Sequence, residues 1–153
     1  MANTYHQIYL QTVFAEKHRQ ALINKEWGKE LYSTIGTLIN DTTCKTIIVN
    51  GVEDHVHCLI GIKPSISISD LMKNIKAKSS KHINDHSLTK KRFEWQEGYG
   101  AFSYSPNHLA KVYDYIKNQE INHQRRTFME EYIDLLKMYK INYKDEYLFH
   151  EPH

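Results

Sequence analysis

The order of strand-like and helix-like segments is the feature that most narrows the folds open to this chain. Strand-type patterns, rich in aromatic and β-branched residues, cover residues 5–14, 44–49, 55–62 and 101–104. Helical spacing of apolar residues follows the first strand after Asn24, and the third strand after Ser69-Asp70. Asn50-Gly51, between the second and third strands, is a hairpin-type turn signal. The order βαββαβ predicts an α+β, ferredoxin-like fold with an antiparallel sheet backed by two helices.

Two more helical stretches follow the last predicted strand. One opens at Ser105-Pro106-Asn107 and runs towards His123, and the other covers residues 129–138. At 153 residues the chain is long enough for one well-packed domain and too short for two ordinary ones. We therefore expect one domain over residues 1–153, with a core of about residues 4–124 and a C-terminal helical extension of about residues 125–153.

The composition is that of a soluble globular protein, with 41% hydrophobic and 25% charged residues. No apolar run approaches the roughly 20 residues needed to cross a bilayer, and the first residues lack the layout of a signal peptide. We expect a cytoplasmic protein without a membrane partner. The two cysteines, Cys44 and Cys58, each lie in a strand-like apolar run, where a buried free thiol is the ordinary expectation.

The positive charges are unevenly placed, although the net charge is only +2. Seven cations fall within twenty residues, and they are Lys73, Lys76, Lys78, Lys81, Lys90, Lys91 and Arg92. Local clusters of this kind attract phosphate, and aromatic residues near cations suit single-stranded nucleic acid. The alternative interpretation is a solvated helix face, which is the commoner meaning of an isolated lysine run.

The segment around His55 and His57 is the first candidate for chemistry. Alternate side chains of a strand share a face, so both imidazoles would project together and could bind one metal ion. Val56 and Cys58 would then supply the opposite, apolar face. The motif taken alone is common for packing reasons, so a third ligand is needed to make a metal site.

The predicted helix after Pro106 offers that third ligand. Tyr115 and Gln119 are four residues apart, which places both side chains on one helical face. The Gln119 carbonyl oxygen could complete a metal site with Tyr115 beside it. The alternative is that Tyr115 packs against the sheet and Gln119 is solvated.

These segments together resemble the single-tyrosine HUH transposases, the insertion-sequence-two-hundred-like family. The resemblance rests on Glu-Asp-His-Val-His at residues 53–57, Gly-Tyr-Gly-Ala-Phe at residues 98–102 and Tyr-Ile-Lys-Asn-Gln at residues 115–119, and it runs from Tyr5 to about His123. It implies that the metal-binding histidine pair is His55 and His57 and that the glutamine ligand is Gln119. It also implies that Tyr115 is the nucleophile.

The resemblance implies a DNA transposase that cleaves and rejoins single-stranded DNA through a 5′-phosphotyrosine intermediate. A tyrosine hydroxyl has an ordinary pKa of about 10, so attack at neutral pH needs an activated phosphate, which a divalent ion can provide. Family resemblance indicates Mg²⁺ or Mn²⁺ as the cofactor. Glu53 and Asp54 could orient an imidazole or a metal-bound water.

The expected DNA contacts combine the basic segment after the first strand with the cation cluster. We expect contacts from Lys17, Arg19, Lys73, Lys76, Lys78, Lys81, Lys91 and Arg92. The resemblance further implies hairpin ends of an insertion sequence as the DNA partner. It also implies a homodimer in which the tyrosine helix of one subunit can complete the histidine site of the other.

Three other interpretations stay open at the level of sequence. A non-catalytic RNA-recognition-like module would share the topology, but Glu97 and Ala101 stand where its aromatic strand motif needs a basic and an aromatic residue. An HUH nicking enzyme of replication or conjugation would keep the same site residues. A purely structural metal would make the protein unfold when His57 is replaced.

Overall fold

The computed structural model describes residues 5–18, 22–121 and 127–141. In chain order its elements are β1 (Tyr9–Ala15), α1 (Lys25–Asp41), β2 (Lys45–Val52), β3 (His55–Gly61), α2 (Ile68–Asp85), β4 (Gly100–Tyr104), the short 3₁₀ helix η1 (Pro106–His108), α3 (Leu109–Lys117) and α5 (Phe128–Met138). Among these helices none is both long and apolar enough to cross a membrane.

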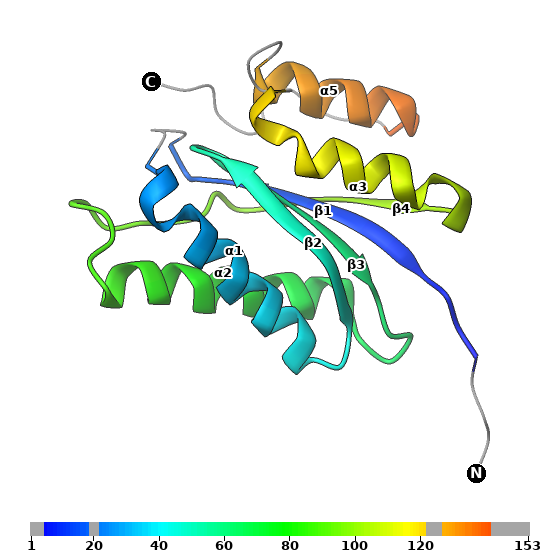
Figure 1. Cartoon of the computed structure of the whole chain (residues 1–153), viewed down its shortest axis with the longest axis horizontal. Helices are drawn as coiled ribbons and strands as arrows, with labels where there is room; N and C mark the ends of the chain where they lie inside the picture. The colour runs from blue at the N-terminus through cyan, green and yellow to red at the C-terminus, as the bar shows by residue number, and fades with distance from the viewer. Residues whose placement is uncertain (1–4, 19–21, 122–126, 142–153) are drawn as a thin grey trace.

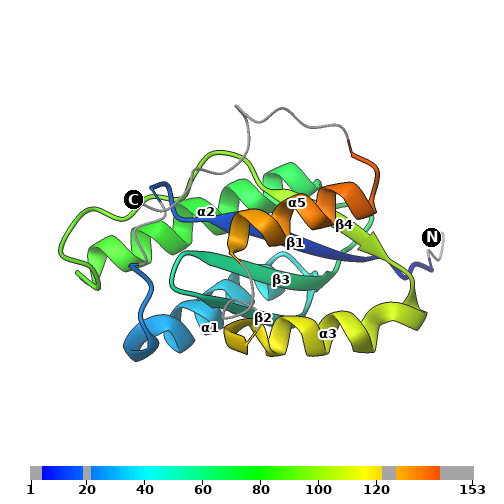
Figure 2. The ribbon, with the colours of Figure 1, turned by 90° about the horizontal axis from the view of Figure 1, so that it is seen from above.

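The four strands form one antiparallel sheet in the order β2-β3-β1-β4. With α1 between β1 and β2 and α2 between β3 and β4, this is the ferredoxin-like arrangement, so the predicted fold class is confirmed. Figure 1 shows α1 and α2 on one face of the sheet and α3 and α5 on the other. In the view from above, α5 crosses over β1 while α3 runs beside β2 (Figure 2).

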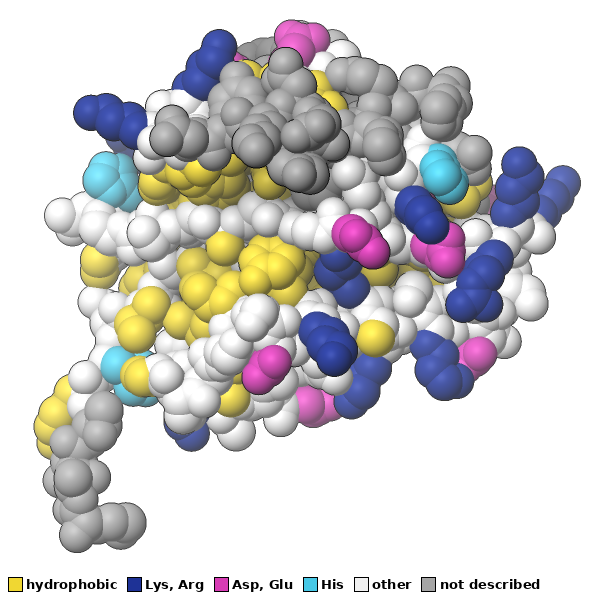
Figure 3. All heavy atoms as spheres, turned by 180° about the vertical axis from the view of Figure 1, so that it is seen from behind, with side chains coloured by type: hydrophobic (Ala, Val, Ile, Leu, Met, Phe, Trp, Pro, Cys, Tyr) yellow, Lys and Arg dark blue, Asp and Glu magenta, His cyan; other side chains and the backbone are white. Residues whose placement is uncertain are grey.

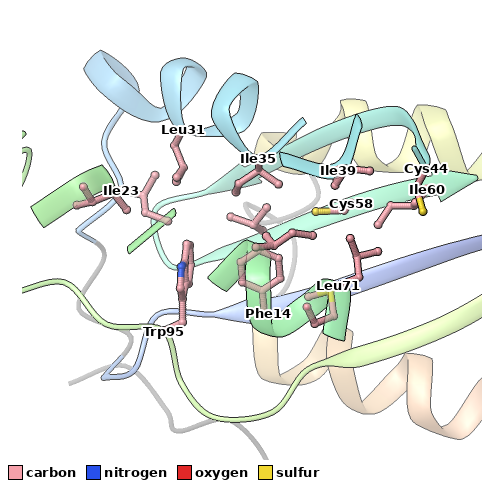
Figure 4. Packing of buried hydrophobic residues seen from close by; sticks show 14 of the residues in the cluster. Phe14, Ile23, Leu31, Ile35, Ile39, Cys44, Cys58, Ile60, Leu71 and Trp95 are labelled. Carbon is pink, nitrogen blue, oxygen red and sulfur yellow. The ribbon is translucent and has the colours of Figure 1, made fainter. Parts of the chain in front are cut away.

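The face covered by α1 and α2 holds the larger hydrophobic core. In Figure 4, Leu31, Ile35 and Ile39 point from α1 towards the sheet, where Phe14 packs edge-on against Trp95 with ring centroids 4.7 Å apart. From β3, the residues that point into this core are Val56, Cys58 and Ile60. Both cysteines are free and buried, as predicted.

The opposite face of the same strands is covered by two smaller clusters. Val13, Ala15 and Phe102 pack against α5, while Leu59 packs against Val112 and Ile116 of α3. Because side chains alternate along β3, this is also the face on which His55 and His57 lie. The sheet therefore separates an ordinary hydrophobic core from a second layer that contains buried polar groups.

The predicted hairpin turn at Asn50-Gly51 is wrong. Both residues belong to β2, and the turn lies at Glu53-Asp54. Gly51 is needed inside the strand for another reason, because a Cβ there would lie 2.3 Å from the His55 backbone oxygen. The glycine permits close approach of two backbones rather than a tight turn.

The other element boundaries differ from prediction by a few residues. Asn24 is confirmed as the α1 cap, since its side chain accepts hydrogen bonds from the backbone N–H of Glu26 and Trp27. The cap of α2 is Ser67 rather than the predicted Ser69, so that helix begins earlier. The first strand begins at Tyr9, four residues later than the aromatic pattern predicts.

Candidate active site

His55 and His57 lie side by side under α5, and both are fully buried. Each imidazole is held at Nδ1 by a neighbouring side chain. His55 Nδ1 is 2.7 Å from Asp54 Oδ1, and His57 Nδ1 is 2.6 Å from Gln11 Nε2. Anchoring both rings at Nδ1 leaves each Nε2 directed at the space between the sheet and α5.

Glu131 of α5 and Gln119 occupy the other side of that space. His57 Nε2 is 2.9 Å from Glu131 Oε1, and His55 Nε2 is 3.9 Å from Glu131 Oε2. His55 Nε2 is also 3.3 Å from Gln119 Oε1. One ligand atom from each of the two histidines and Glu131 lies within 4.8 Å of the others, close enough for one metal ion to contact all three.

Burial and charge set the protonation of this cluster. Burial lowers the pKa of His55, and this outweighs the opposing effects of Asp54 and Glu131, so the ring is held neutral as a metal ligand requires. Burial alone would raise the pKa of Glu131. His57, His55 and the Tyr115 hydroxyl together favour its charged form more strongly, and the pKa falls to about 2.

The donor set fits a divalent metal ion. Although Glu131 and His57 are within ion-pair distance, His57 Nε2 and both Glu131 carboxylate oxygens lack a hydrogen bond of acceptable geometry among the described residues. Buried polar atoms without such bonds are unfavourable unless something else satisfies them. An ion bound by two imidazoles and a carboxylate would satisfy all three atoms.

Gln11 determines which nitrogen of His57 is available to an ion. With its amide nitrogen towards Nδ1, the proton of the neutral ring is on Nε2, facing Glu131. Metal binding through Nε2 requires the amide to turn over, so that its oxygen accepts the Nδ1 proton. The Tyr104 hydroxyl, which now donates to Gln11 Oε1 at 2.8 Å, would then accept a hydrogen bond from the amide.

Tyr115 lies at the edge of this cluster. Its ring centroid is 6.0 Å from that of His57, and its hydroxyl interacts with Glu131. Asn50 fixes the end of the helix, because its side-chain amide donates to the backbone oxygens of Ile116 and Lys117 at 2.9 and 3.1 Å. These bonds tie the tyrosine-bearing segment to β2, the neighbour of the histidine strand.

Tyr115 and Gln119 do not share one uninterrupted helix, contrary to prediction. A turn at Asn118 ends α3, and Gln119 lies beyond it. The Gln119 side chain nevertheless stays close to the preceding turn, since its Nε2 is 3.5 Å from the Tyr115 backbone oxygen. Gln119 is fully buried, not solvated, and its side-chain oxygen faces His55.

Asp54 and Glu53, the two acidic residues beside the histidines, have different surroundings. Asp54 is buried and contacts His55, whereas Glu53 is exposed and lines a separate pocket together with Lys25 and Tyr32. Of the two, only Asp54 lies where it can orient an imidazole.

Most of the cations expected at DNA lie away from this site. Lys73, Lys76, Lys78 and Lys81 belong to α2, which covers the other face of the sheet (Figure 1). Figure 3 shows the molecule from behind, and on that side Lys and Arg side chains are interspersed with acidic ones. Arg19 lies outside the described residues.

Several of these cations already have partners. The Lys76 ammonium donates to the backbone oxygens of Gln96 and Gly98 at 2.7 and 2.9 Å, and burial lowers its pKa. Lys81 pairs with Asp85, and Lys17 pairs with Glu94 at 3.3 Å. Lys76 thus holds the segment before β4, which is a structural role that charge clustering does not reveal.

The two remaining cations lie on the segment before β4. Arg92 Nε is 3.9 Å from Glu94 Oε1, and Lys91 is exposed.

Sequence reasoning missed Glu131, Gln11 and Asn50. Glu131 had a detectable signal, since it lies three residues after Phe128 and four before Leu135, both of which are buried on one face of α5. A carboxylate at an apolar-face position is unusual and indicates a buried partner. Gln11 and Asn50 act through contacts between distant segments, which no local pattern reports.

Comparison with known proteins gives a consistent result. The family described as "Transposase IS200 like" matches residues 4–119. The transposase for insertion sequence element IS200 of Salmonella typhimurium strain LT2 is 29% identical over 124 residues, covering 78% of this chain and 81% of the relative. The relative of the same name from Salmonella typhi gives the same values.

Two solved structures share the fold. A crystal structure described as a candidate transposase from Deinococcus radiodurans R1 aligns with a TM-score of 0.63 at 20% identity, over 78% of this chain and 95% of that one. A REP-associated tyrosine transposase bound to a REP hairpin aligns with a TM-score of 0.56 at 17% identity, over 80% of this chain and 74% of that one.

Proposed function

Since this chain belongs to the IS200-like transposase family, we propose that it cleaves and rejoins single-stranded DNA by transesterification, with Tyr115 as the nucleophile. The observation that carries this proposal is the convergence of Tyr115, the two histidines and Glu131 from three separate elements of one chain. Tyr115 is also partly exposed, so its hydroxyl can meet a substrate, whereas the histidines cannot be approached from solvent directly.

The reaction exchanges one phosphodiester for another. The Tyr115 phenol oxygen forms a bond to phosphorus as the bond from phosphorus to the 3′ oxygen breaks. The phenol loses its proton and the leaving 3′ oxygen gains one, which gives a 5′-phosphotyrosine and a free 3′ hydroxyl. A second 3′ hydroxyl can reverse the step at a new strand, so rejoining needs no nucleotide cofactor.

The residues around the tyrosine would hold a divalent ion, for which we propose Mg²⁺ or Mn²⁺. His55, His57 and Glu131 are the ligands that the donor set supports, and Gln119 is a fourth candidate through its amide oxygen. Such an ion supplies charge stabilisation on the phosphate oxygens. The carboxylate and amide oxygens are suitable ligands for Mg²⁺ or Mn²⁺, which the family resemblance implies, and two imidazoles with a carboxylate would also suit Zn²⁺.

The chain's own residues position this chemistry. Asp54 and Gln11 fix the ring orientations of the two histidines, and Asn50 fixes the end of the tyrosine helix. α5 covers the cluster from above and keeps it out of water, which strengthens every electrostatic interaction within it.

The proposed DNA partner is a hairpin end of an insertion sequence. One structural neighbour is described as bound to a REP hairpin, which supports a similar class of ligand. We also propose a homodimer, as the family resemblance implies. The contacts between Tyr115, His57 and Glu131 within one chain support an active site assembled in cis, without exchange of the tyrosine helix.

The decisive experiment is incubation of the protein with labelled single-stranded element ends and Mn²⁺. We expect a covalent protein–DNA adduct that peptide mapping assigns to Tyr115, and no adduct with Tyr115→Phe. Tyr113→Phe is the matched control, because Tyr113 is on the same helix but 37% exposed and outside the cluster. An adduct that persists in Tyr115→Phe, or binding without cleavage by the unaltered protein, would contradict the proposal.

A further inference from the structure

A cavity of about 660 Å³ lies beside Tyr115, between the end of β4, α3 and α5. Tyr104, Tyr115 and Tyr139 line it, together with apolar side chains such as Leu135. Its volume falls within the roughly 300–1,000 Å³ range of pockets that bind small organic ligands. The cavity can therefore enclose one nucleotide.

The cavity is connected to the proposed chemistry through two of its lining residues. Tyr115 forms one part of its wall, and Gln11, which contacts His57, forms another. The histidines are fully buried while Tyr115 is only partly so. A strand that brings a phosphate to the Tyr115 hydroxyl must therefore place the adjoining nucleotide in or across this cavity.

The aromatic walls are held in fixed positions. Tyr104 and Tyr139 meet edge to face, with ring centroids 5.9 Å apart. The Tyr139 hydroxyl donates to the Ser103 backbone oxygen at 3.0 Å, and the Tyr104 hydroxyl donates to Gln11. Rings fixed in this way lose little conformational entropy when a flat ligand stacks on them.

Charge at the cavity suits a nucleotide. Lys111 precedes Tyr115 by four residues on α3, so their side chains share a helical face, and both line the cavity. His108, one turn earlier, also lines it. Among the described residues that line the cavity, the one carboxylate is Asp134, which belongs to α5 on the opposite side.

We propose that this cavity binds the base of the nucleotide adjoining the scissile phosphate, with Tyr139 as a stacking surface and Lys111 as a phosphate contact. The inference rests on the proposed function, since it takes single-stranded DNA as the substrate. It adds a base-binding subsite, and with it a determinant of where the strand is cut.

The test measures the affinity of the full-length Tyr115→Phe protein for two labelled probes of equal length and charge. This protein serves as the parent because it binds DNA without cutting it. One probe is an oligothymidylate and the other is a strand whose sugars lack bases. We expect Tyr139→Ala to weaken oligothymidylate binding about 5- to 150-fold and to leave base-free binding unchanged. Lys111→Ala should weaken both probes, because it removes a phosphate contact.

Tyr139→Phe is the conservative variant, because it keeps the ring and removes the hydroxyl that bonds to Ser103. We expect it to bind oligothymidylate more tightly than Tyr139→Ala does. Since Tyr139 also packs on Phe102, Ser105→Trp provides a second variant that fills the cavity from an exposed position. This variant should weaken the binding of oligothymidylate and leave the binding of the base-free strand unchanged.

The proposed subsite is refuted if Tyr139→Ala and Ser105→Trp lose affinity equally for both probes, or if neither variant loses affinity. A change of oligomeric state in place of affinity also overturns it, because the cavity would then be a subunit contact. If the parent protein binds neither probe, the proposed function itself fails. The two failures are therefore distinguishable.

Discussion

Replacing Glu131 with Gln removes one charge from the buried cluster while keeping the shape of the side chain. The pKa of Glu131 falls from 4.5 to about 2 in the folded protein. At about 1.4 kcal/mol for each tenfold change in proton affinity, the folded environment favours the carboxylate by about 3 kcal/mol. We expect Glu131→Gln to lower the free energy of unfolding by up to that amount at neutral pH.

The sign of the pH dependence follows from the direction of the shift. Because the folded pKa is the lower one, the charge-dependent stability is fully present above pH 4.5 and is lost as the pH falls towards 2. The difference in free energy of unfolding between the unaltered protein and Glu131→Gln should therefore shrink as the pH falls from 4.5 towards 2. Urea unfolding at a series of pH values measures this difference.

Metal binding adds a second readout for the same variant. An ion present at a hundred times its dissociation constant stabilises a folded protein by about 2.7 kcal/mol, which is about 5–11 °C in Tm for a chain of this size. We expect Mn²⁺ to give such a shift with the unaltered protein and a much smaller one with Glu131→Gln, measured by scanning calorimetry.

Glu130→Gln is the matched control on the same helix. Glu130 is exposed, its backbone N–H donates to the Thr127 hydroxyl, and its side-chain oxygen accepts from that hydroxyl, a role that Gln also fills. It should leave both the pH profile and the Mn²⁺ shift unchanged. Equal Mn²⁺ stabilisation of Glu131→Gln and the unaltered protein would refute Glu131 as a ligand, and unchanged stability would refute the charge argument.

Three further predictions test the supports of the site. Asn50→Ala should lower stability by about 1–3 kcal/mol, because two backbone oxygens at the end of α3 lose their donor, and urea unfolding measures it. Gly51→Ala should destabilise the protein and weaken Mn²⁺ binding, since the new Cβ would meet the His55 backbone oxygen, and calorimetry with and without Mn²⁺ measures both. Lys73→Ala should leave adduct formation unchanged, because α2 lies across the sheet from Tyr115; a large loss in a gel assay would contradict this placement.

The fold was largely predictable because its information is local. Alternation in β3 and helical spacing in α1 and α2 follow from the burial of one face, and the cap at Asn24 is a local hydrogen-bond pattern. The turn after β2 was misplaced because Asn-Gly carries the same signal whether a glycine makes a turn or permits close backbone approach. Only the neighbouring backbone of His55 distinguishes the two.

The candidate site was predictable only in part for a related reason. His55, His57, Tyr115 and Gln119 lie in short motifs, and the structure brings them together. Glu131 reaches them from a helix beyond the matched family region, so the chain must fold before its role can be seen. The DNA contacts expected from the lysines stay a prediction, since sequence density of charge does not reveal which ammonium groups are already bonded, as Lys76 is.

One face of β3 packs in the hydrophobic core, and the other carries the histidine pair. The register of this strand therefore determines both the core and the candidate site. If the strand slipped by one residue against β1, Val56 and Cys58 would turn towards α5 and the imidazoles would enter the hydrophobic core. Such a slip would destabilise the folded protein and would also remove the histidine pair from the candidate site. Any selection that keeps the sheet stable therefore also preserves the geometry of the histidine pair.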